Sequence, residues 1–151
     1  MKKLFLCFIL LIGFDSYSQK TSHYLNKIDK NNIEFDGVVS DEEIKNASEI
    51  SLKYEISPSY NTDAIRSTVA YINYTDTYLY VGIKAQRDRV ISNIINRDDW
   101  AMYNGDAISI ELDTYGDARN QIFLVANPSG SLLDAIRLDG RGYSGSDYNL
   151  K

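Results

Sequence analysis

The chain has 151 residues, 44% of them hydrophobic, with 16 basic and 21 acidic residues and a net charge of −5. Its lysines and arginines are scattered, which disfavours nucleic acid and anionic membrane surfaces as partners, because both require clustered positive charge. The single cysteine, Cys7, offers no internal disulfide, and a chain of this length can bury a core without one. We therefore expect one folded domain.

The first 18 residues have the three parts of a secretory signal peptide. Lys2 and Lys3 precede an apolar run at residues 4–14, and Ser16 and Ser18 supply small residues before a cleavage site. The apolar run is shorter than the roughly 20 residues that a membrane-spanning helix needs, so no transmembrane segment is predicted. We expect export to the periplasm, the outer membrane or the extracellular space, and a mature chain with a net charge of −6.

Residues 19–32 are polar and are predicted to form a flexible lead-in to a domain at residues 33–151. This domain is expected to open with a short strand and an Asp36-Gly37 turn, followed by a helical turn with Ser40 or Asp41 as its N-cap. Further strands are predicted at 49–54, 67–74, 78–86, 107–113, 121–127 and 132–138. Between them, residues 57–64 read as a loop, and a short helix is predicted at residues 90–95.

Two of these strands alternate strictly between apolar and polar residues, as strands with one buried face do. The residues predicted to point inward are Leu79, Val81, Ile83, Ala85, Ile108, Ile110 and Leu112. Tyr80 is predicted to face outward and to pack across the strands. About eight short strands with no alternating helices predict an all-β fold, an antiparallel β-sandwich with one short helical turn.

Short motifs follow one another between residues 33 and 134. They are Asp36-Gly37 followed by Asp41, Ile44 and Ala47; Thr68-Val69-Ala70-Tyr71 with Leu79-Tyr80-Val81-Gly82; Arg97-Asp98-Asp99; Gly105-Asp106; Ile110-Glu111-Leu112-Asp113-Thr114; Asp117; and Asn127-Pro128-Ser129-Gly130. In order and approximate spacing, this set resembles family 9 carbohydrate-binding modules. The resemblance implies a jelly-roll-like sandwich that binds an oligo- or polysaccharide.

The subgroup that the chain most resembles stands at the N-terminus of Gram-negative outer-membrane proteins, ahead of a β-barrel. This resemblance implies that the chain is a fragment lacking its last strand, with a barrel of the same protein as a partner. Two features depart from the family pattern. Ile44 stands where the family usually has tryptophan, and Trp100 is the only tryptophan where characterised members use two.

Candidate sugar-binding residues combine aromatic platforms for apolar sugar faces with polar groups for hydroxyls. They are Trp100, Tyr103, Tyr115, Arg97, Asp98 and Asn127. Each has a structural alternative: Trp100 as a core aromatic, Arg97 and Asp98 as a loop brace, and Asn127 as part of a turn before Pro128.

Four aspartates are candidate ligands for a structural calcium ion, which the family resemblance also implies: Asp99, Asp106, Asp113 and Asp117. No EF-hand spacing is present, so solvated turn carboxylates are the alternative reading. The only histidine, His23, lies in the lead-in, which disfavours zinc.

No enzyme is predicted, and no cofactor is required. The predicted domain contains no histidine for a Ser-His-Asp triad, and it has no phosphate-binding glycine loop. Any carbohydrate hydrolysis would belong to an attached domain. Three hypotheses follow: a carbohydrate-binding module, a non-catalytic interaction domain, and a calcium-stabilised structural module.

Overall fold

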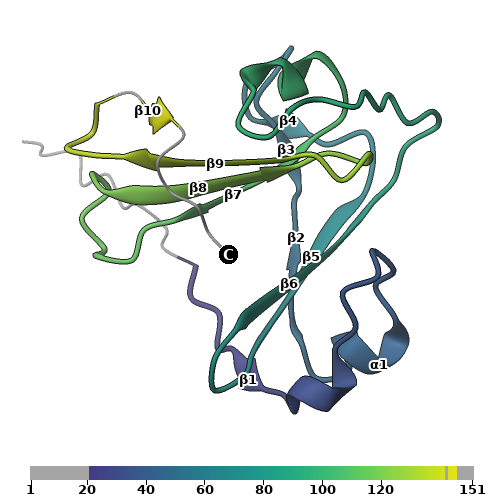
Figure 1. Ribbon diagram of the computed structural model, residues 1–151. Coiled ribbons are helices and arrows are strands. Elements are labelled where there is room, and N and C mark those ends of the chain that lie inside the picture. Colours follow the sequence, from purple (N-terminus) through teal and green to yellow (C-terminus); the bar gives the residue numbers. More distant parts are fainter. Residues whose placement is uncertain (1–20, 142, 146–151) are drawn as a thin grey trace, which may run out of the picture. The chain divides into compact units, whose positions relative to one another are not determined.

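A computed structural model describes residues 21–141 and 143–145, and the predicted signal peptide lies outside this part of the chain. The described residues form ten strands in three sheets, with only short helices (Figure 1), which confirms the all-β class. None of the helices in this part is long and apolar enough to cross a membrane. The chain divides into two compact units, one up to Gln86 and one from Arg87 onward.

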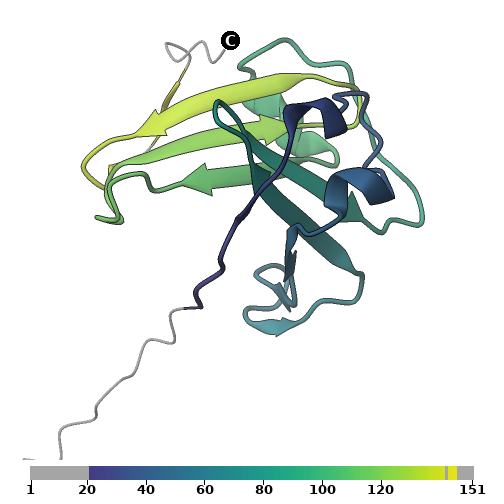
Figure 2. The same ribbon diagram turned by 90° about the horizontal axis from the view of Figure 1, so that it is seen from below.

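The first unit is built on the central strand β5 (Thr68–Tyr74). Strand β6 (Leu79–Ala85) pairs antiparallel along one edge of β5, and β2 (Ser48–Ser51) pairs antiparallel along the other. The short strand β1 (Asn26–Lys27) pairs parallel with the last two residues of β5. Figure 2 shows the purple segment that contains β1 leading into a helical turn. The sheet therefore includes residues of the predicted lead-in, which continues into a 3₁₀ turn, η1 (Lys30–Asn32).

The predicted helical turn is present as α1 (Asp41–Ile44), and Ser40 is its N-cap. The Ser40 hydroxyl accepts a hydrogen bond from the Glu43 backbone N–H at 3.4 Å, and the Glu43 carboxylate accepts one from the Ser40 backbone N–H at 2.8 Å. This reciprocal arrangement is a capping box, which satisfies donors that a helix start leaves unpaired. A Ser-x-x-Glu pattern at this point in the sequence is sufficient to specify it.

The alternation predicted in β6 is present, but the prediction of its more buried face was wrong. Tyr80 is only 6% exposed, and a Cβ added to Gly82 would lie 3.0 Å from the Val39 side chain. Leu79, on the opposite face, is exposed. The segment leading into α1 covers the Tyr80 face, with the Phe35 ring 6.3 Å from the Tyr80 ring and Glu43 hydrogen-bonded to the Tyr80 hydroxyl.

A separate two-stranded ribbon, β3 (Tyr54–Glu55) with β4 (Thr62–Asp63), occupies the predicted loop region. Its residues and their neighbours expose large apolar side chains, namely Tyr54, Ile56, Tyr60 and Ile65. We call this set the exposed ribbon.

The second unit contains an antiparallel sheet in the order β10-β9-β8-β7 (Figure 1). Its strands are β7 (Ile108–Leu112), β8 (Gln121–Ala126), β9 (Leu132–Arg137) and β10 (Tyr143–Gly145). The first three match predicted strands. The predicted helix at residues 90–95 was wrong: the helix of this region is a 3₁₀ turn, η2 (Trp100–Asn104). Residues 90–95 form no helix, and the Ile95 backbone exchanges hydrogen bonds with the Ser131 hydroxyl.

The two faces of this sheet differ in what covers them. One face, the core face, carries Phe123, Val125, Leu133 and Ala135, which pack with Met102 of η2 into a buried cluster. The other face carries Ile110, Leu112, Ile122, Leu124 and Ile136, all half-buried. Ile110 and Leu112 are more buried than their neighbours Ser109 and Glu111, as the alternation predicted. The prediction was wrong for Ile108, which is exposed at the start of β7.

Candidate functional site

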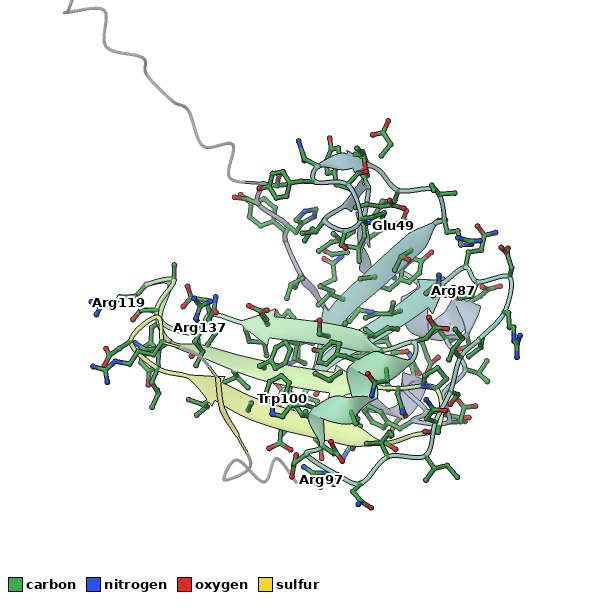
Figure 3. The ribbon with its side chains drawn as sticks, turned by 90° about the horizontal axis from the view of Figure 1, so that it is seen from above. Glu49, Arg87, Arg97, Trp100, Arg119 and Arg137 are labelled. Carbon is green, nitrogen blue, oxygen red and sulfur yellow. The ribbon has the colours of Figure 1, made fainter. Side chains whose placement is uncertain are left out.

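Trp100 lies over the core face of the second sheet (Figure 3). Its ring stacks on the buried Phe123 ring, with centroids 6.0 Å apart and planes within 13°. It also runs nearly parallel to the Tyr103 ring, at 6.2 Å and 17°. Trp100 is 42% exposed and Tyr103 is 49% exposed. These three rings form what we call the aromatic platform: two partly exposed rings with Phe123 as their support.

The turn η2 sets the position of the platform. Asp99 caps it by accepting the Ala101 backbone N–H at 2.9 Å, and Met102 anchors it in the core at 1% exposure. Residues i and i+3 eclipse one another in a 3₁₀ helix, so Trp100 and Tyr103 share a face. At the end of η2, Gly105 lies so close to the segment around Ile91 that a Cβ added to it would be 2.8 Å from the Ile91 carbonyl oxygen.

Tyr103 reaches the outer strand of the same sheet. Burial raises the pKa of its hydroxyl, a hydrogen bond with Ser109 of β7 opposes that change, and the nearby Glu111 carboxylate raises the pKa further. The phenol therefore stays neutral and able to hydrogen-bond at ordinary pH, while its ring remains half exposed.

Polar side chains continue along the core face beside the platform. Glu111 is the cross-strand partner of Phe123, so it lies next to the ring that supports Trp100. The next pair along the strands is Gln121 and Arg137, whose side chains are joined by a hydrogen bond of 3.2 Å. Sequence reasoning did not select Gln121 or Arg137. Their alternation with Phe123 and Ala135 was the available signal, because it places all four on one face.

Arg97 and Asp98 brace the loop before η2. The Arg97 guanidinium pairs with Asp134, a buried carboxylate in the middle of β9, and Asp98 accepts the Asp134 backbone N–H at 3.1 Å. In the register of β9, Asp134 points away from the core face, because Ala135 next to it belongs to that face. Arg97 thus attaches to the side of the sheet opposite to the aromatic platform.

Asn127 organises the turn between β8 and β9. Its amide oxygen accepts the backbone N–H groups of Ser129 at 3.1 Å and Ser131 at 2.9 Å, and its amide nitrogen donates to the Asn93 carbonyl at 2.8 Å. Both ends of the amide are therefore engaged inside the protein. The structure does not place Asn127 beside Trp100.

Tyr115 lies in the loop between β7 and β8, and its side chain is exposed. Two aspartates stabilise the conformation of this loop. Asp113 accepts the backbone N–H groups of Gly116 at 2.7 Å and Ala118 at 2.8 Å. Asp117 accepts those of Arg119 and Asn120, which hold its pKa below the ordinary range. These carboxylates complete turns within their own loop.

The other two predicted metal ligands lie at the opposite end of β7. Asp99 caps η2, and Asp106 binds the Arg87 guanidinium at 2.6 Å and the Ile91 backbone N–H at 2.8 Å. The Arg87 side chain is the main reason why the pKa of Asp106 is lowered. Among the residues that the structure describes, no three acidic, histidine or cysteine side chains gather as a metal-binding group.

Two hollows of the described surface are lined by other residues than those of the platform. One of about 250 Å³ lies among polar residues near η1 and α1, and one of about 290 Å³ lies beside Arg97 and the β8–β9 turn. A comparison with protein-family models, curated proteins and solved structures finds nothing that matches this chain.

Proposed function

We propose that this chain is a non-catalytic carbohydrate-binding module, and that the aromatic platform holds the sugar. The observation that carries the proposal is Trp100, a large ring that is 42% exposed although it is fixed in place by the buried Phe123. An aromatic ring that is partly exposed and already fixed in orientation presents an apolar face to a ligand with little further ordering.

The chemistry of the surroundings supports the same function. The C–H face of a pyranose is apolar and packs on aromatic rings, whereas its hydroxyls need hydrogen-bond donors and acceptors. Glu111 supplies an acceptor carboxylate beside the platform, and Gln121 with Arg137 supplies both donors and an acceptor one pair further along. The motif resemblance to family 9 modules points to the same ligand class, and the predicted signal peptide to an exported protein.

The proposal assigns no catalysis to these residues, so any carbohydrate turnover would come from another domain. A structural calcium ion remains a prediction. A melting curve with added calcium and then with a chelator tests it: a bound ion would raise the melting temperature only while calcium is present.

Replacing Trp100 by alanine is expected to lower sugar affinity at least about tenfold, because the variant loses the ring face that packs on the sugar; tenfold corresponds to about 1.4 kcal/mol. Calorimetric titration with soluble oligosaccharides measures the change. Tyr78→Ala is the matched control, since it removes an exposed aromatic side chain of the first unit that is no candidate for sugar binding. Equal loss in both variants, or no loss in Trp100→Ala, would refute the site.

We also propose that the all-β fold is an antiparallel β-sandwich, the arrangement that short strands with frequent turns predict.

A second candidate function is supported by the exposed ribbon. Several exposed apolar side chains on one small element are typical of protein-interaction surfaces. The chain would then act as a non-catalytic domain that packs on another part of its own protein or on another envelope protein. Loss of binding to the partner protein in Tyr60→Ser, with no change in that binding in Trp100→Ala, would favour this alternative.

A further inference from the structure

We propose that the platform binds the interior of a linear glycan chain, along a track that runs from Tyr103 through Trp100 to the Gln121–Arg137 pair. The inference rests on the proposed function and specifies its ligand class. It comes from the distance between the Trp100 and Tyr103 rings and from the polar residues next to them on the core face.

The two exposed rings are too close together to hold a sugar between them. A sugar ring clamped by two opposed rings contacts both, which needs ring planes about 7–8 Å apart, twice the contact distance between carbon atoms. The centroids of Trp100 and Tyr103 are only 6.2 Å apart, with planes within 17° of parallel. The two rings therefore cannot grip a single sugar between them, and each can offer its exposed part to a successive sugar unit of a chain.

The strand register extends this line. Tyr103 is hydrogen-bonded to Ser109, the cross-strand partner of Val125, and Trp100 lies over Phe123, two residues before Val125 in β8. Gln121 stands two residues before Phe123 and pairs with Arg137. Successive positions on one face of a strand are about 7 Å apart, so three binding positions follow one another along β8.

Figure 3 agrees with this order, since Arg137 lies further along the strands than Trp100, toward the loop that carries Arg119. Arg137 donates to Gln121 at 3.2 Å and to the Gly140 carbonyl at 3.5 Å. These contacts hold the guanidinium beside the third position, where its N–H groups can donate to sugar hydroxyls. Arg97 cannot serve this track, because it attaches to the other side of the sheet.

The test is a calorimetric titration of the whole chain with cello-, xylo-, manno- and laminari-oligosaccharides, from the monosaccharide to the hexasaccharide. In the series that binds, affinity should rise severalfold with each added sugar up to the trisaccharide and then level off. Reduction of the hexasaccharide to its alditol should change affinity less than twofold, because five intact sugar rings remain and an interior-binding track does not read the chain end.

Variants locate the third position. Arg137→Ala should reduce trisaccharide affinity to that of the disaccharide while leaving disaccharide affinity unchanged. Arg137→Lys, which keeps the charge, guards against a folding defect and should recover part of the loss. Arg119→Ala is the control, because Arg119 lies in the loop and pairs only loosely with Asp139 at 3.7 Å.

The outcomes separate the two proposals. A monosaccharide that binds as tightly as the trisaccharide, or complete loss of binding on reducing the chain end, overturns the track but leaves a sugar-binding module. Binding of none of the oligosaccharides overturns both.

Discussion

Replacing Glu43 by alanine is expected to cost the fold about 3 kcal/mol, because truncation would strip partners from several donors at once. The Glu43 carboxylate is 2% exposed. It accepts the backbone N–H of Glu34 at 2.8 Å, and both the backbone N–H at 2.8 Å and the hydroxyl of Ser40. It also hydrogen-bonds the Tyr80 hydroxyl. Urea unfolding followed by circular dichroism measures the loss.

Glu42→Ala provides the matched control in the same turn of helix. Its carboxylate is exposed and lies 3.8 Å from Lys45, so its removal should cost less than about 0.5 kcal/mol. Comparable losses for the two variants would contradict the role assigned to Glu43.

The same site predicts a dependence of stability on pH. The backbone N–H groups of Ser40 and Glu34 hold the pKa of Glu43 below its ordinary value of 4.5. A carboxyl with a lowered pKa in the folded state stabilises the fold above the pKa of the unfolded chain, and this stabilisation is lost as the pH falls through the folded-state pKa. Glu43→Gln should therefore show a shallower loss of stability below about pH 4.5 than the unaltered chain. An equal slope in both would argue against the lowered pKa.

Met102→Ala is the second change with a large expected effect. The side chain is 1% exposed and packs with Phe123, Val125 and Leu133 beneath η2. Truncating a buried methionine typically costs about 2–5 kcal/mol, because the cavity collapses only partly. The aromatic platform stands on the same turn, so sugar affinity should fall together with stability. Urea unfolding and calorimetric titration measure the two effects.

Met102→Leu is the control for Met102→Ala. It nearly conserves the side-chain volume, so it should lower the free energy of unfolding by less than about 1.5 kcal/mol and leave sugar binding intact. A stable Met102→Ala variant with full sugar affinity would mean that η2 does not depend on the core for its position.

The strands of the second unit could be predicted because each is a local pattern. Ile108, Ile110 and Leu112 alternate with polar residues, and the Asn127-Pro128 turn separates the next two strands. The capping box at Ser40 and Glu43 is equally local. Alternation shows which residues share a face, but it does not reveal what covers that face. For this reason Tyr80 was predicted on the wrong side: its burial depends on Phe35 and Glu43, which are distant in sequence.

The candidate site shows the same limit. Trp100 and Tyr103 are three residues apart, so sequence reasoning could select both, and a 3₁₀ turn brings them together. Arg97 is just as near to Trp100 in sequence, yet its ion pair with Asp134 attaches it to the other side of the sheet. Alternation within β8 places Gln121 on the face of Phe123, but only the register of β8 with β9 brings Arg137 beside Gln121.

The most direct test of the account is the intrinsic fluorescence of Trp100, the only tryptophan in the chain, titrated with the soluble oligosaccharides. A ring that is 42% exposed should emit like a solvated indole, and it should shift to the blue and saturate when a glycan covers it. That result would support the aromatic platform as a sugar site. Emission that is already blue, shielded from quenchers and unchanged by every oligosaccharide would contradict it.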